Sequence, residues 1–330
     1  MLKFILTIFI IWRINLEFLA WLGEKFIPPR QGFLGPIPWA NFDGVHYLSI
    51  AQNGYFQFEQ AFFPFYPLLI RFLGRLLGGN FILAGMVISH LSLLGALILF
   101  WKLIEISHIR RWAIAFLLFS PTSFFFGSLY TESLFLFLIL FSFYALEKRK
   151  KWLYFVGASL ASATKLVGAF LLFPLGLFAY MYYLAKNFKD PLYFIHAQPA
   201  FGAGRSGGEI ILLPQVYWRY LKIFFTVPLT NYDYWIAVLE FLVFNFALFL
   251  LWRGWRRGLP RSWILFSTLA VIGPTLTGSL SSIPRYALTA FPIFIVLANF
   301  DKRIKYLLLV TCYLLLCLLT ILFTRGFFVA

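Results

Sequence analysis

Long apolar stretches alternate with short polar or charged runs along most of this 330-residue chain. A helix that crosses a bilayer needs about 20 mostly apolar residues. Stretches of this kind lie near 2–23, 81–101, 112–129, 131–146, 234–252, 262–280, 286–300 and 305–324. The stretch 152–185 is also apolar but is interrupted by Lys165, Gly168 and Pro174, and 216–229 is borderline. The pattern predicts an all-α, polytopic membrane protein with about nine to eleven transmembrane helices in a single domain, 1–330.

Composition excludes the water-soluble classes. The chain is 62% hydrophobic, 22% aromatic and 12% charged, and its mean hydropathy is +0.84. Soluble domains are about 45–50% apolar and about 25% charged. A cytosolic enzyme, a DNA-binding protein and a secreted disulfide scaffold are therefore excluded. The first apolar stretch is followed by Trp and Glu rather than by a small-residue cleavage site, so we expect a retained helix.

The charges predict an orientation in the membrane. Lys and Arg number 28 against 12 Asp and Glu, and the basic residues gather in the runs 102–111, 147–151, 252–261 and 301–305. Such runs mark cytoplasmic loops, which puts the N-terminus inside and the segment 24–80 outside, as a long first extracytoplasmic loop. The turns near 128–131 and 279–285 then lie outside too, and the polar segment 186–215 is ambiguous. Anionic membrane lipids, and not nucleic acid, are the expected partner of this charge.

One carboxylate stands out among the twelve. Asp43 lies in the loop 24–80, three residues before His46 and among aromatic residues, so the two side chains share a face if the segment is helical. This pattern is compatible with two roles for Asp43. It could belong to a site that binds a sugar and transfers a proton, or it could be a solvated residue that caps a helix. Glu17 follows Arg13 by four residues and forms a structural pair, whereas Glu240 lies near a helix end, where its charge needs no function.

A series of motifs, in order along the chain, resembles the PIG-V mannosyltransferases, a family within the GT-C superfamily of polytopic glycosyltransferases. The matching residues are Asp43, His46, Ile50-Ala51, Gly54-Tyr55, Phe62-Phe63-Pro64 with Pro67, Ser120-Pro121, Tyr130 to Phe135, Ala163-Thr164-Lys165 with Gly168, Asp190 to Gln198, and Pro284-Arg285-Tyr286. The chain departs from the family at Val45, where an acidic or polar residue is usual, and at Lys165, which replaces an Arg.

The resemblance implies a GT-C-like fold, a polyprenyl-phosphate sugar donor, a lipid-linked or glycan acceptor and inversion at the anomeric carbon. It implies Asp43 as the catalytic base, with His46 beside it. Arg285 is the best phosphate ligand because its planar fork suits bidentate contact, and Arg205 and Lys165 are second choices. Glu132 would bind sugar hydroxyls unless it only complements a helix dipole. Further substrate-binding candidates are Tyr55, Gln198 and Tyr286.

No metal-ligand motif appears, and we expect neither a metal nor another cofactor. The expected location is the cell membrane, with a multi-pass chain and an extracytoplasmic active site. Two alternatives remain. One is a GT-C enzyme for another sugar, such as arabinose, galactose or glucose. The other is a lipid or solute transporter, which would show charges near mid-membrane and an internal repeat; no repeat is visible.

Overall fold

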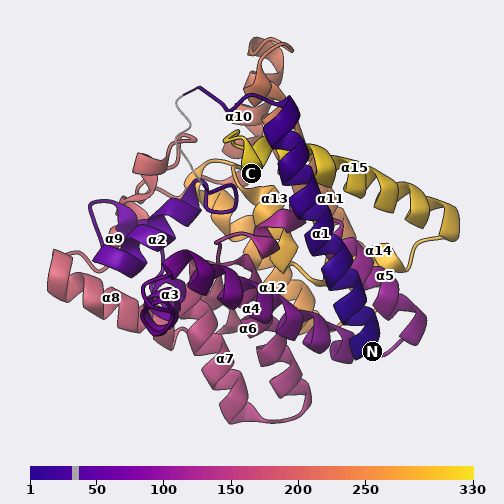
Figure 1. Ribbon diagram of the computed structural model, residues 1–330, viewed down its shortest axis with the longest axis horizontal. Coiled ribbons are helices and arrows are strands. Elements are labelled where there is room, and N and C mark those ends of the chain that lie inside the picture. The colour runs from indigo at the N-terminus through magenta and orange to yellow at the C-terminus, as the bar shows by residue number, and fades with distance from the viewer. Residues whose placement is uncertain (32–36) are drawn as a thin grey trace.

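The computed structural model describes residues 1–31 and 37–330, and this part of the chain is helical with no strand (Figure 1). The predicted all-α class is confirmed; residues 32–36 of the predicted loop 24–80 lie outside the described residues. The helices of the first half are α1 (Leu2–Phe26), α2 (Asp43–Asn53), α3 (Phe65–Leu76), α4 (Phe81–Leu103), α5 (Ser107–Leu118), α6 (Glu132–Glu147), α7 (Lys151–Thr164) and α8 (Leu175–Phe188). Those of the second half are α9 (Tyr193–His196), α10 (Leu213–Thr226), α11 (Tyr232–Arg256), α12 (Arg261–Ile272), α13 (Ile283–Tyr286), α14 (Pro292–Ala298) and α15 (Lys302–Thr324).

Four helices, α1, α4, α11 and α15, are long and apolar enough to cross a membrane. Each has 23 to 25 residues, which makes it about 35 Å long at 1.5 Å per residue. These four correspond to the predicted stretches 2–23, 81–101, 234–252 and 305–324. The chain is therefore a helical membrane protein in its described part.

The other predicted stretches are made of shorter pieces, so fewer helices than the nine to eleven expected meet the length of a crossing. The stretch 112–129 is divided between α5 and a 3₁₀ turn at Ser123–Gly127, and 286–300 contains α14, only seven residues long. All seven residues of α14 are buried. Hydropathy cannot tell a short helix buried in protein from one that faces lipid, because both are apolar; interrupted backbone is tolerated at membrane depth where protein covers it.

The predicted interruption of 152–185 is confirmed. α7 ends at Thr164, a 3₁₀ segment spans Leu166–Leu171, and α8 begins after Pro174. Proline lacks the N–H that a continuing helix needs. α6 packs between α4 and α7, and most of its residues are buried. This brings the N-terminal end of α6 next to the C-terminal end of α7.

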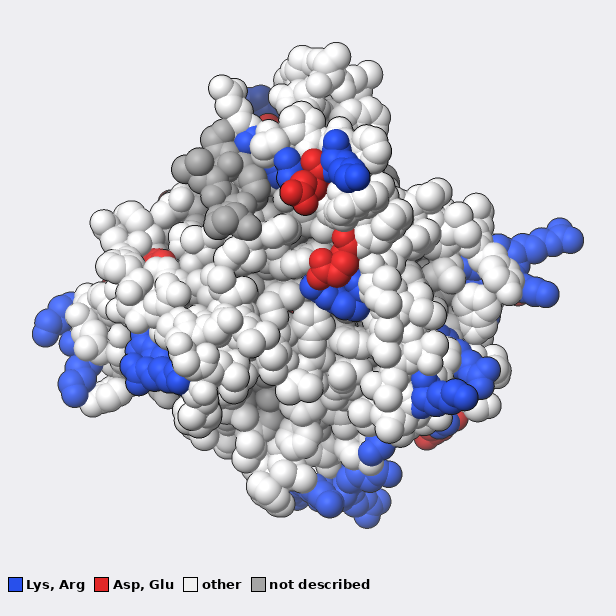
Figure 2. All heavy atoms as spheres, in the orientation of Figure 1, with Lys and Arg blue, Asp and Glu red and all other residues white. Residues whose placement is uncertain are grey.

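The four basic runs meet at one end of the bundle, together with the N-terminus. Figure 2 shows Lys and Arg over the α6–α7 turn and the outer end of α15, and Figure 1 places that turn on the same side of the view as the N-terminus. The linking contacts are those of Lys102 and Lys148 with the ring of Tyr144, Lys305 with Trp112, Arg111 with Phe4, and Arg257 with the carbonyl of Asn299.

The segments predicted to lie outside also contact one another. The Tyr130 hydroxyl, from the turn 128–131, donates to the carbonyl of Asn41 at 2.8 Å. The ambiguous segment 186–215 joins them, since the backbone N–H of Ser206 donates to the carbonyl of Thr277 at 2.8 Å. Asp43 and Arg285 lie among these segments.

Candidate active site

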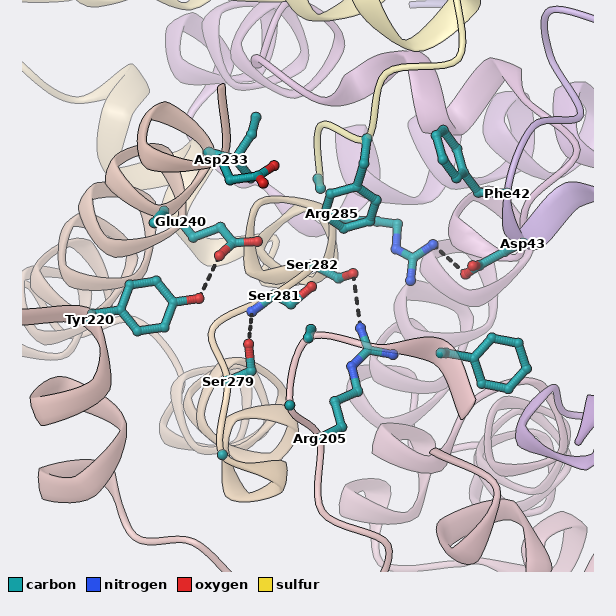
Figure 3. A pocket seen from close by; sticks show the side chains of 18 of the residues that line it. Phe42, Asp43, Arg205, Tyr220, Asp233, Glu240, Ser279, Ser281, Ser282 and Arg285 are labelled. Atoms are coloured by element: carbon teal, nitrogen blue, oxygen red, sulfur yellow. Dashed lines mark hydrogen bonds and ion pairs between the residues drawn. The ribbon is translucent and has the colours of Figure 1, made fainter. Parts of the chain in front are cut away.

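Asp43 and Arg285, which are 242 positions apart in the sequence, form an ion pair. The distance from Arg285 Nη1 to Asp43 Oδ2 is 2.5 Å, and Figure 3 shows the two side chains facing each other. Asp43 is the first residue of α2, where the positive end of the helix dipole favours a carboxylate. The Arg285 side chain is nearly buried and the Asp43 side chain is 27% exposed, so the carboxylate is the partner that solvent or a ligand can reach.

Two strained residues fix the pair. Phe42 precedes Asp43 with a φ of 52°, and Ser282 precedes α13 with a φ of 67°. Left-handed backbone at a residue other than glycine costs about 1–3 kcal/mol and persists only where surrounding contacts impose it. Such residues are often found at active sites. Here they set the directions in which α2 and α13 begin.

A buried chain of charges continues behind Arg285. Arg285 Nε lies 3.4 Å from Glu132 Oε1, and Lys165 Nζ lies 2.5 Å from the same oxygen. Glu132 is fully buried and Lys165 is 9% exposed. The Lys165 ammonium also lies 5.0 Å from the ring centroid of Tyr286. Asp43, Arg285, Glu132 and Lys165 thus form an alternating row of two negative and two positive groups.

The state of Asp43 follows from two opposing effects. Burial favours its neutral form, but the charge and hydrogen bond of Arg285, with smaller contributions from Arg205 and His46, outweigh burial and hold the pKa of Asp43 below its usual value. Beside Arg285, Asp43 is therefore an ionised carboxylate bound to a cation. A carboxylate in this state is a weak base.

A cavity of about 670 Å³ opens at this ion pair, within the range of small-molecule sites. Four of the predicted site residues line it: Asp43, His46, Arg205 and Arg285. Arg205 approaches from the segment 186–215, and its Nη2 lies 3.4 Å from Ser282 Oγ (Figure 3). The two arginines place positive charge on two sides of the space beside Asp43.

His46 is held by its neighbours. Its Nδ1 lies 3.2 Å from Glu59 Oε1, and its ring stacks on Phe62 with centroids 4.9 Å apart. Phe201 meets the imidazole edge-on. Glu59 is buried and also accepts the backbone N–H of Phe56 at 3.0 Å. The predicted common face of Asp43 and His46 is thus present, with the imidazole fixed in one orientation.

The remaining predicted site residues do not line this cavity. Glu132, Lys165 and Tyr286 lie behind Arg285. The Tyr55 hydroxyl donates to the carbonyl of Phe62 at 2.8 Å and lines a separate, mostly apolar cavity of about 430 Å³. Gln198 donates to the carbonyl of Phe194 at 3.1 Å.

The far wall of the cavity was not predicted from the sequence. The Tyr220 hydroxyl donates to Glu240 Oε2 at 2.5 Å, and Arg219 Nη1 donates to the carbonyl of Gly278 at 2.9 Å. The assignment of Glu240 to a helix end was wrong: it lies in the third turn of α11, is 4% exposed and lines the cavity. A carboxylate inside an apolar helix is itself a signal of a functional site, and this signal could have identified it.

No family model, curated protein or solved structure matches this chain. In residues 1–31 and 37–330, no group of three or more His, Cys, Asp or Glu side chains lies close enough together to hold a metal ion. The motifs and the geometry of the cavity therefore carry the functional argument.

The buried pair of Lys165 and Glu132 gives a stability prediction. Lys165→Met should lower the free energy of unfolding by about 3 kcal/mol, because the buried Glu132 loses its nearer cation and keeps only the more distant Arg285. Thermal unfolding in detergent measures this effect, with Lys186→Met on the exposed side of α8 as the matched control. The double variant Lys165→Met with Glu132→Gln should recover much of the loss. An unchanged midpoint in the single variant would show that the pair is not structural.

Proposed function

We propose that this protein is an inverting membrane glycosyltransferase that moves a mannosyl residue from a polyprenyl-phosphate donor to a lipid-linked or glycan acceptor at the extracytoplasmic face. The observation that carries the proposal is the meeting of Asp43, Arg285 and Arg205 in one cavity. A base beside a pair of guanidinium groups supplies both requirements of such a transfer: a proton acceptor and a site for a leaving phosphate. The PIG-V resemblance gives Asp43 and Arg285 by motif, and Arg205 is a second-choice phosphate ligand by its charge.

At the anomeric carbon one bond forms and one bond breaks. An acceptor hydroxyl oxygen attacks the anomeric carbon, the bond from that carbon to the phosphate oxygen breaks, and polyprenyl phosphate leaves. The hydroxyl proton passes to Asp43, with His46 beside it to orient the acceptor. Arg285 and Arg205 stabilise the negative charge that grows on the phosphate. The apolar part of the wall, which includes Phe42, Ile236 and Phe328, offers contact to the first prenyl units.

The arrangement of charges supports the extracytoplasmic side. All four basic runs gather at one end of the bundle, while the cavity lies among the segments predicted to be outside. In this proposal the shorter helices complete a GT-C-like set of about nine to eleven crossings around α1, α4, α11 and α15.

A donor screen tests the proposed function. Purified protein is incubated with undecaprenyl-phosphate mannose, glucose, galactose or arabinose and with octyl α-mannoside as acceptor, and the products are identified by mass spectrometry and linkage analysis. We expect transfer from the mannose donor with inversion. Transfer from another donor alone would replace mannose by that sugar in the proposal. Binding of every donor without transfer to octyl α-mannoside would overturn the proposal in favour of a carrier.

A further inference from the structure

The proposed function gives Asp43 and Arg285 tasks that conflict while the two are paired with each other. A base must have its carboxylate available to the acceptor, and a phosphate ligand must present its guanidinium to the donor. Instead the two groups neutralise each other at 2.5 Å. Both side chains line the same cavity. The Asp43 carboxylate therefore occupies the position on Arg285 that an approaching phosphate would take.

The surroundings allow Arg285 to change partners. Behind it, Glu132 Oε1 lies 3.4 Å from Nε, and neither that Nε nor Glu132 Oε2 has a hydrogen-bond partner among the described residues. Arg285 therefore keeps a buried carboxylate beside it when Asp43 leaves. Asp43 is the more exposed member of the pair and is the group that can turn away.

Charge balance favours an exchange. The row of Asp43, Arg285, Glu132 and Lys165 sums to zero. A phosphodiester brings one negative charge, so the phosphate and an ionised Asp43 would both compete for Arg285. Like charges close together raise the pKa of the more basic one, which is the carboxylate, so Asp43 becomes a stronger proton acceptor.

Resting on the proposed function, we propose that the donor phosphodiester replaces the Asp43 carboxylate on Arg285, and that this exchange releases Asp43 as the base only after the donor has bound. The ion pair with Arg285 thereby keeps the carboxylate from acting as a base until the exchange occurs. Arg205, which lies beside Ser282 and lines the same cavity, takes a second phosphate oxygen. Premature attack by an acceptor or by water is suppressed because the base and the leaving-group site become active together.

The charged and ionisable groups around Asp43 come from several elements. They are His46 on the same helix, Arg285 on α13, Arg205 in the segment after α9, and the phenols of Tyr47 and Tyr130. Burial and the neighbouring carboxylates raise the pKa of both phenols well above its usual value. The phenols therefore stay neutral. His46, Asp233 and Glu240 also line this cavity, so proton uptake is assigned to Asp43 only by its loss in Asp43→Asn.

Calorimetry separates these possibilities. Farnesyl-phosphoryl mannose, a phosphodiester, is titrated into the full-length protein in detergent at about pH 5, one unit above the usual Asp value, in two buffers of different ionisation enthalpy. The exchange predicts uptake of a substantial fraction of a proton, retained in His46→Gln and lost in Asp43→Asn. It also predicts that Asp43→Asn binds this donor about tenfold more tightly, a difference of about 1.4 kcal/mol, because Arg285 no longer has a competing anion.

Binding without proton uptake in the unmodified protein, or weaker binding in Asp43→Asn, would overturn the exchange and leave the proposed function standing. If farnesyl-phosphoryl mannose does not bind at all, and the donor screen shows no transfer, both proposals fail. A purely structural role for Asp43 predicts weaker binding and a lower unfolding temperature in the variant, which is the opposite of what the exchange requires.

Discussion

Asp43→Asn is expected to lower the rate of sugar transfer by about 10²- to 10⁴-fold, the usual contribution of a general base. The amide keeps the size of the side chain and can still hydrogen-bond, but it cannot accept a proton at neutral pH. The measurement is the initial rate of transfer from undecaprenyl-phosphate mannose to octyl α-mannoside at saturating donor.

The matched control is Asp301→Asn, because Asp301 is an exposed carboxylate that precedes α15 in the basic run at the other end of the bundle. Its rate should equal that of the unmodified protein. Full activity in Asp43→Asn, with the same unfolding temperature, would remove Asp43 from the mechanism and return it to the role of a residue that only holds Arg285.

Arg285→Lys is expected to raise KM for the donor by about 10- to 100-fold, the scale of a charge-assisted hydrogen bond worth about 1.5–3 kcal/mol. Lysine keeps the positive charge between Asp43 and Glu132 but loses the planar fork that holds a phosphate bidentately. The donor dependence of the rate is measured at fixed acceptor concentration.

Arg256→Lys, at the exposed end of α11 on the opposite side of the bundle, makes the same substitution away from the cavity and should leave KM unchanged. Arg285→Ala is less informative, since it would leave the buried Glu132 with Lys165 as its only cation. An unchanged donor KM in Arg285→Lys would contradict the phosphate role.

The sequence predicts which residues meet at the cavity better than it predicts their contacts. Motifs and the predicted outer side indicate Asp43 and Arg285, and the structure brings these two side chains together. Glu132 and Lys165 were expected to touch the substrate, yet they pair with each other behind Arg285. The positions of the basic runs along the chain predict on which side of the membrane a residue lies. They do not predict which of several charged side chains on that side will pair with one another.

The fold was predictable in its long helices and less so between them. α1, α4, α11 and α15 are uninterrupted apolar segments, and hydropathy identifies such segments directly. α14 and the 3₁₀ segment Ser123–Gly127 are equally apolar because other parts of the protein cover them. The far wall of the cavity depends on the approach of α10 to α11, for instance through Tyr220 and Glu240, and no periodicity in either helix indicates that approach.

The shared contact of Lys102 and Lys148 with Tyr144 has a consequence for the stability of two turns. Lys102 lies in the last turn of α4 and Lys148 follows α6, and both reach the same ring only when these two helix ends are adjacent. Because α4 and α6 pack along each other, one aromatic side chain holds two charged helix ends together. Removing the Tyr144 ring should therefore loosen both turns at once.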